Sequence, residues 1–302
     1  MMKQSMGMKM QTLNALEKKL DSTKDLQSVV KTMKAIAAVS IRQYNLAVES
    51  LKFYNRTIDM SFSVLLRHSP EFYEQPQSEK NAPSGFVILG SDQGMCGQFN
   101  EDLATFIKNT TGELNLDSDN CTALVLGQKI VPYINDLDIK IEEQLWLPGA
   151  LNGISNSTIE VLFKISEWHK DENIQNIYLF YNLSKSGASY EPHYFKLLPL
   201  DKQKIENLKH FEWRSTSIPI FKVGRQTLLA NLLRQYFFVS VYRAFAESLA
   251  SENLSRLASM QAAEKNIDER LQDLENNYNR QRQSSITSEL LDLVSGYEVL
   301  SQ

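Results

Sequence analysis

Both ends of the sequence lack glycine and proline. Neither residue occurs in the 62 positions from Met8 to Ser69 or in the 71 positions from Arg225 to Ser295, although the 302-residue chain holds 12 Gly and 8 Pro. Because these residues punctuate loops and turns, their absence excludes loop-rich folds at the ends. We expect a long helix in residues 1–69, a second in residues 225–302, and a folded domain in residues 70–224.

Cysteine, histidine and long apolar runs are also scarce. The two cysteines, Cys96 and Cys121, form no CxxC pair, which favours two reduced thiols over a metal or redox site. The four histidines are scattered without the spacing of metal ligands. No apolar run approaches the roughly 20 residues of a membrane span, and the run from Tyr236 to Val241 is flanked by arginines. We therefore expect neither a metal nor a membrane-spanning helix.

The N-terminal stretch carries an excess of positive charge. Residues 8–69 hold ten Lys or Arg against five Asp or Glu. Such a helix could face nucleic acid or an acidic protein surface. Nucleic-acid binding would need denser basic clusters or interleaved aromatic residues, so no nucleic-acid partner is expected. An acidic protein partner and a plain solvated face remain open.

Apolar and small residues in the N-terminal stretch recur with alternating steps of four and three. The pattern runs from Leu26 to Ile58 and is typical of a coiled-coil seam. The C-terminal stretch continues the same spacing from Leu257 to Tyr278, with Glu264 as one polar lapse. Since isolated amphipathic helices are poorly stable, we expect the two stretches to pair as an antiparallel coiled coil.

The seam of the C-terminal stretch becomes polar over residues 280–285, and apolar residues return from Ile286 onward. A self-contained coiled coil would stay apolar there. Hydrogen-bonding side chains gather within about two turns, and they suit either a protein interface or a solvated face. They are Arg282, Gln283, Thr287 and Glu289.

The middle of the sequence alternates short apolar runs with amphipathic stretches. This alternation predicts a Rossmann-like α/β domain with parallel strand pairing. The expected strands are residues 85–91, 121–127 and 177–181, with a possible fourth at 194–200, and the expected helices are residues 99–108, 129–137 and 157–170.

A glycine-rich loop follows the first expected strand. Glycines between a strand and a helix can cradle a phosphate, but residues 90–97 have the spacing G-x-x-x-G-x-x-G, which matches neither the dinucleotide fingerprint nor the P-loop. We interpret the loop as a tight turn for close packing and expect no cofactor. No catalytic Ser/His/Asp arrangement stands out, so the chain is not expected to be an enzyme on its own.

Three segments resemble the gamma-subunit family of F-type ATP synthases: residues 30–42, 91–100 and 259–296. The last is the longest and most specific. Ser40 and Gln93 stand where the family has lysine and arginine. With these departures the chain resembles the divergent alternate type found in a second bacterial operon.

The resemblance implies a noncatalytic central-stalk rotor subunit, peripheral to the cytoplasmic face of a bacterial membrane. Its partners would be the alpha and beta subunits of the catalytic ring, the epsilon subunit and the membrane c-ring. Torque would pass between the catalytic ring and the membrane rotor. The coupling ion, proton or sodium, is chosen outside this subunit.

The resemblance also implies roles for particular residues. Arg282, Gln283, Thr287 and Glu289 match residues that contact a beta-subunit loop, whereas Lys31, Met33 and Lys34 match the region that faces an acidic beta-subunit lever. The central-domain motif comprises Asp92, Gly94, Cys96, Gly97 and Asn100. Two alternatives stay open at this point: a coiled-coil adaptor, and a nucleotide-binding α/β enzyme with helical extensions.

Overall fold

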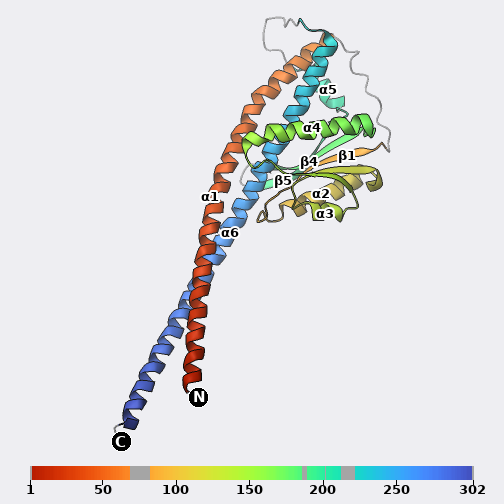
Figure 1. Ribbon diagram of the computed structural model, residues 1–302. Helices are drawn as coiled ribbons and strands as arrows, with labels where there is room; N and C mark the ends of the chain where they lie inside the picture. Colours follow the sequence, from red (N-terminus) through yellow and green to blue (C-terminus); the bar gives the residue numbers. More distant parts are fainter. Residues whose placement is uncertain (1, 69–81, 186–188, 201, 212–221, 301–302) are drawn as a thin grey trace. The chain divides into compact units, whose positions relative to one another are not determined.

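The computed structural model describes residues 2–68, 82–185, 189–200, 202–211 and 222–300. Two long helices, α1 (Met2–His68) and α6 (Arg225–Leu300), flank a central sheet in the sequence (Figure 1). By compactness the chain divides into two units. We call Met1–Ile36 with Leu257–Gln302 the paired-helix unit, and Ala37–Arg256 the α/β unit. The expected fold class is confirmed, and the division at residues 69 and 224 stays a prediction.

The paired-helix unit is an antiparallel pair. Gln27 Nε2 donates to Asp268 Oδ1 at 2.5 Å, and Lys34 Nζ contacts Glu264 Oε2 at 2.5 Å. Residue numbers therefore fall along α6 in the direction in which they rise along α1. In the described part of this unit the buried apolar side chains are few, and they are Leu20, Val30, Met260 and Leu274. This core is thin for helices of such length, because helix stability in proteins comes mostly from burial of an apolar face.

The α/β unit contains one five-stranded sheet. Its strands lie in the order β3 (Lys140–Leu145), β2 (Cys121–Leu126), β1 (Ser84–Leu89), β4 (Asn176–Lys185) and β5 (Ser189–Leu198). The expected parallel pairing is confirmed for β1 with β2 and for β1 with β4, and β2 also pairs parallel with β3. The expectation is wrong for β5, which pairs antiparallel with β4. Only three residues separate these two strands, and a parallel pair would need a crossover of a dozen or more.

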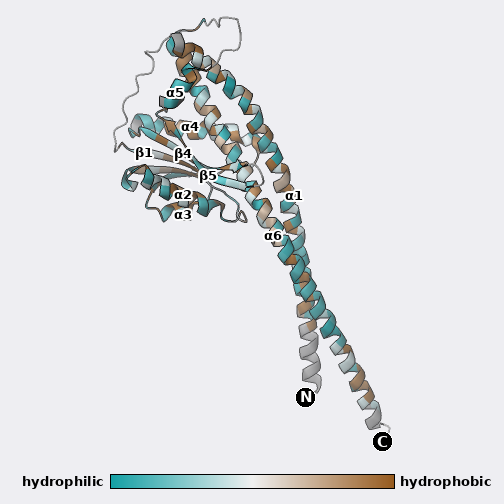
Figure 2. Cartoon of the chain, turned by 180° about the vertical axis from the view of Figure 1, so that it is seen from behind, coloured by the Kyte–Doolittle hydropathy of each residue, from teal (hydrophilic) through white to brown (hydrophobic). Residues whose placement is uncertain are grey.

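Helices cover both faces of the sheet. On one face, α4 (Ile154–Asp171) and the middle of α6 share a core with apolar side chains of β1, β2 and β4. On the other face, α2 (Phe99–Glu113) and α3 (Val131–Asn135) pack on the alternate side chains of the same strands. Figure 2 shows the resulting concentration of hydrophobic residues along the sheet. These helices confirm the predicted α/β layers.

Strand β3 and helix α5 are absent from the sequence-based prediction, as are the single-turn 3-10 helices η2 (Ser118–Asn120) and η3 (Leu151–Gly153). Strand β3 is an edge strand with the sequence Lys-Ile-Glu-Glu-Gln-Leu, and none of its side chains is buried. Helix α5 (Lys202–Lys209) is short and strongly polar, although Ile205 and Leu208 are buried. Neither offers the apolar periodicity that identifies an element in a sequence.

The middle of α6 is embedded in the α/β unit. Ten consecutive residues, Ala244–Asn253, are all buried. A helix that is buried all round lies within a core rather than on a surface. Within the described residues, no helix has a stretch apolar and long enough to cross a lipid bilayer.

The ends of β1 and β2 approach each other closely at Gly127. Its φ is +104°, and a Cβ atom there would lie 2.7 Å from the backbone nitrogen of Ser91. Lys129 N donates to Ser91 O at 2.9 Å across the same contact. Gly127 therefore sets how closely the two strand-to-helix loops can pack.

We expect Gly127→Ala to lower the free energy of unfolding by about 2–4 kcal/mol, because it combines a strained φ with a backbone clash. Gly94→Ala is the matched control, since no atom lies within 4 Å of its added Cβ. Urea unfolding followed by tryptophan fluorescence measures both. Trp146 and Trp168 lie in the described part of the α/β unit. Equal stability of the two variants would contradict the close approach.

Candidate functional site

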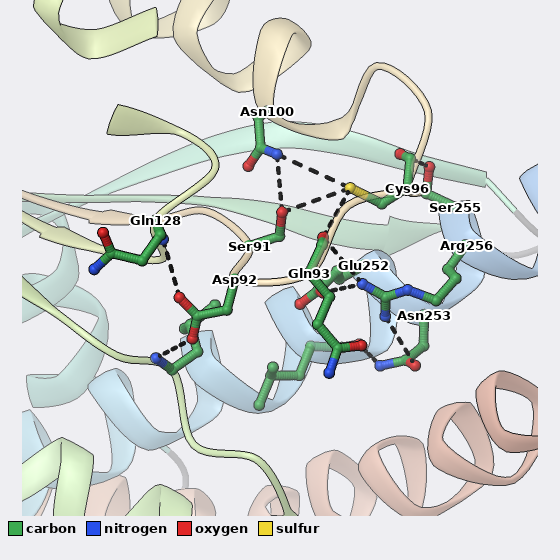
Figure 3. Close-up of polar contacts among 12 residues, drawn as sticks. Ser91, Asp92, Gln93, Cys96, Asn100, Gln128, Glu252, Asn253, Ser255 and Arg256 are labelled. Carbon is green, nitrogen blue, oxygen red and sulfur yellow. Dashed lines mark hydrogen bonds and ion pairs between the residues drawn. The ribbon is translucent and has the colours of Figure 1, made fainter. Parts of the chain in front are cut away.

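The predicted central-domain motif forms the loop between β1 and α2. Asp92 accepts hydrogen bonds from Gln128 N at 2.9 Å and Leu147 N at 2.7 Å (Figure 3). Those two amides follow β2 and β3, so one carboxylate ties together the loops after three neighbouring parallel strands. The Asp92 carboxylate therefore holds together the loops at the carboxyl ends of these strands.

Cys96 lies in a buried polar cluster with Ser91 and Asn100. Its Sγ is 3.5 Å from Ser91 Oγ, and Asn100 Nδ2 donates to the same Ser91 oxygen at 2.8 Å (Figure 3). Burial raises the pKa of the Cys96 thiol above its ordinary value. A protonated, buried thiol is a poor nucleophile, so the cluster supports packing rather than covalent chemistry.

The two glycines of the motif have different roles. Gly97 has a φ of +58°, in the left-handed region that glycine adopts without strain. Gly94 has open space around it. Among the described residues, no three His, Cys, Asp or Glu side chains gather in a way that could hold a metal ion.

The same loop is held by the buried part of α6. Arg256 Nη2 donates to Gln93 O at 3.3 Å, and Ser255 Oγ donates to Cys96 O at 2.5 Å (Figure 3). Arg256 also forms an ion pair with Glu252, and both side chains are 7% exposed. We call these contacts the α6–loop clamp. The clamp fixes α6 to the sheet edge that Asp92 orders.

Sequence reasoning missed the clamp. Its one sequence signal is the four-residue spacing of Glu252 and Arg256, which places opposite charges on one helix face. Nothing in the sequence indicates that this face is buried against a carbonyl of residue 93.

The predicted beta-contact residues of α6 lie in the paired-helix unit and are all exposed: Arg282, Gln283, Thr287 and Glu289. Between and beyond them α6 also leaves large apolar side chains uncovered, with exposed fractions of 46–76%. These are Ile286, Leu290, Leu291, Leu293, Val294 and Tyr297. Contiguous exposed apolar residues mark interaction surfaces.

The predicted contact residues of α1 differ in their surroundings. Lys31 is exposed and Met33 is half-buried. Lys34 is half-buried and paired with Glu264, the residue that interrupts the apolar seam. The interruption therefore has a partner within the chain, which the sequence did not reveal.

The structure does not bring the two predicted groups into one site. Glu264, the partner of Lys34, precedes Arg282 by 18 positions on α6, which is about 27 Å along a helix axis. If both groups bind a partner, they contact different parts of it.

Comparisons with known proteins decide the family. A family described as ATP synthase matches residues 12–300. The ATP synthase gamma chain of Histophilus somni (strain 2336) is 30% identical over 285 residues, covering 92% of this chain and 96% of the relative. This chain belongs to the ATP synthase gamma chain family. The gamma chain of Glaesserella parasuis is also similar, at 27% identity over 282 residues.

Solved structures confirm the fold. A chain of the Euglena gracilis mitochondrial ATP synthase, from a structure of OSCP, F1 and c-ring in rotational state 3, matches with a TM-score of 0.63 at 16% identity. The match covers 96% of this gamma chain and 94% of the Euglena chain. The fold is thus shared at low sequence identity.

We expect Arg256→Met to lower the free energy of unfolding by about 3–5 kcal/mol, because it leaves the buried Glu252 carboxylate without its partner. Urea unfolding followed by tryptophan fluorescence measures the loss. Adding Glu252→Leu should recover part of it, since neither charge then remains buried. Lys265→Met is the control, because its 3.9 Å pair with Glu269 is exposed and such pairs are worth about 1 kcal/mol or less. A loss no larger than the control's would contradict the clamp.

Proposed function

We propose that this gamma chain is the noncatalytic central-stalk rotor subunit of a rotary F-type ATP synthase. It transmits torque between the alpha/beta catalytic ring and the membrane rotor. Family membership over residues 12–300 supports this role. The observation that carries it is the uncovered end of α6, where polar contact groups and large apolar side chains are exposed on a thinly packed helix pair. A coiled-coil adaptor would not account for the family match.

The similarity to rotor chains of solved ATP synthases and the exposed surfaces support the following partners. Arg282, Gln283, Thr287 and Glu289 would contact a beta-subunit loop, and the apolar residues beyond them would lie against the inner wall of the ring. The exposed Lys31 would face an acidic lever of the beta subunit, with Met33 beside it. The pairing of Lys34 with Glu264 lowers its availability for that lever. We assign the α/β unit to the epsilon subunit and the c-ring.

The mechanical role rests on the α6–loop clamp. A rotor subunit must turn as one piece, so the shaft helix cannot slip against the domain that joins it to the membrane side. The buried ion pair and the two side-chain-to-carbonyl contacts oppose such slippage at Arg256 and Ser255. Catalysis would belong to the other subunits, and the complex would lie on the cytoplasmic face of the bacterial membrane.

Reconstitution tests the proposal directly. The chain mixed with the alpha and beta subunits of its own organism should give a stable complex with ATPase activity, whereas omission of the chain should not. Failure of the chain to assemble with the alpha and beta subunits would contradict the proposal. Equilibrium dialysis with labelled ATP should show no binding to the chain alone, and stoichiometric binding would favour a nucleotide-binding enzyme instead.

The combined variant Gln283→Ala and Thr287→Ala should lower coupled turnover of the reconstituted complex about tenfold. Each lost interfacial hydrogen bond is worth about 0.5–1.5 kcal/mol, and both side chains are exposed in the chain alone, so its stability should not change. Steady-state ATP-driven ion pumping measures the effect, in the complete complex with its membrane subunits in lipid vesicles. The control pair, Gln272→Ala with Asn276→Ala, changes exposed amides elsewhere on α6. Equal turnover in the two pairs would argue against the assigned contact.

A further inference from the structure

Each helix of the paired-helix unit carries one charged residue in the face that contacts the other helix. On α1, Lys34 lies one turn after the buried Val30, and on α6, Glu264 lies one turn after the buried Met260. The two side chains contact each other at 2.5 Å and are 36% and 19% exposed. The contact between the helices therefore contains a partly buried ion pair.

This ion pair occupies positions where apolar side chains would bury more surface. The buried apolar side chains in the described part of the unit are few: Leu20, Val30, Met260 and Leu274. A buried ion pair contributes little net stability, and apolar residues in its place are often neutral or stabilising. In coiled coils, a polar residue at such a position instead specifies the partner and the register, at a cost in stability. We therefore look for the effect of the pair in specificity.

Helix α1 has a competing partner in a second copy of itself. Lys34 and Glu264 are 230 positions apart, and a chain folds from its N-terminal end during synthesis. Helix α1 is thus complete before its partner in the same chain exists. Even in the finished pair, Leu26, Val29 and Ile36 of α1 are 55–60% exposed. Uncovered apolar helix surfaces of this kind promote association between copies.

The charges of the two helices distinguish the correct pairing from self-pairing. Residues 13–36 hold five Lys and three Asp or Glu, a net charge of +2, whereas residues 257–278 hold two Lys or Arg and five Asp or Glu, a net charge of −3. In two α1 helices paired parallel and in register, each Lys34 would face the Lys34 of the other copy. Like charges in such a contact raise the free energy of the wrong pair.

We propose that the Lys34–Glu264 pair selects the partner of α1, favouring α6 of the same chain over α1 of a second copy. It acts mainly by penalising the wrong pair, since the correct pair gains little stability from it. The selection does not depend on the rotor role, because it concerns how a single chain completes its own fold.

Refolding of the full chain from urea tests the selection. The apolar variant, Lys34→Met with Glu264→Leu, has no charge at this contact, so the two pairings differ less in free energy. We expect its dimer fraction to be at least fivefold that of the unchanged chain at the same concentration, measured by size-exclusion chromatography with light scattering. The matched control, Lys24→Met with Glu269→Leu, makes the same changes at exposed positions and should leave the dimer fraction unchanged.

Charge exchange separates partner selection from a merely structural role. Lys34→Glu places two carboxylates at one contact and should lower the thermal midpoint followed by far-ultraviolet circular dichroism. Adding Glu264→Lys should restore that midpoint and keep the chain monomeric, because self-pairing would still bring like charges together.

Three results would overturn the proposal. The first is an apolar variant that dimerises no more than its control, and the second is a charge-exchanged chain that dimerises or does not recover its midpoint. The third is a dimer of the apolar variant whose lysine crosslinks, mapped by mass spectrometry, lie outside α1. If the apolar variant does not refold, the charge exchange decides alone.

Discussion

The burial of α6 within the α/β unit is the constraint on which the other features of that unit depend. Residues 244–253 are all buried, so their polar side chains need hydrogen-bond partners within the protein rather than in water. Ser251 and Asn253 do so by donating to carbonyls one turn earlier, and Ser248 donates to Leu89 O at the end of β1. The helix is thus part of the sheet's core and also part of its hydrogen-bond network.

Burying the charged side chains in this part of α6 carries the largest desolvation penalty. Glu252 and Arg256 are buried together, and a buried pair contributes little net stability while either partner alone is strongly unfavourable. Such a pair therefore acts mainly to specify one arrangement. Here that arrangement brings Arg256 to the carbonyl of Gln93, in the loop that Asp92 ties to two neighbouring strands. A shaft helix held in one register on its domain is what torque transmission requires.

The sequence predicts the parts of this fold that depend on local chemistry. The absence of Gly and Pro predicts α1 and α6, and the apolar runs predict β1, β2 and β4 with their intervening helices. What it does not predict depends on contacts between distant residues. Strand β3 is recognisable only beside β2, and the direction of β5 follows from its antiparallel pairing with β4.

The candidate sites also differ in whether they depend on local sequence or on contacts between distant residues. The resemblance assigns Arg282, Gln283, Thr287 and Glu289 to a beta-subunit contact, which stays a prediction; the structure shows that all four side chains are exposed. The assignment of Lys34 to the beta-subunit lever stays a prediction, and its pairing with Glu264 was not foreseen because the two residues are 230 positions apart. The sequence shows only the Glu252–Arg256 spacing of the clamp and not its contact with the loop, which joins residues 93 and 256.

The two parts of α6 place opposite demands on one helix. In the α/β unit the helix is enclosed by its own chain, and its polar groups are almost all paired within that unit. In the paired-helix unit few apolar side chains are buried, and Leu290, Leu293 and Tyr297 are exposed. A helix end with that composition is stabilised little by contacts within its own chain. Burial of its apolar side chains against an apolar surface of a partner would stabilise it much more. The free energy that orders this end in the working complex must therefore come from its partners, which is the condition for a shaft that is gripped by a surrounding ring.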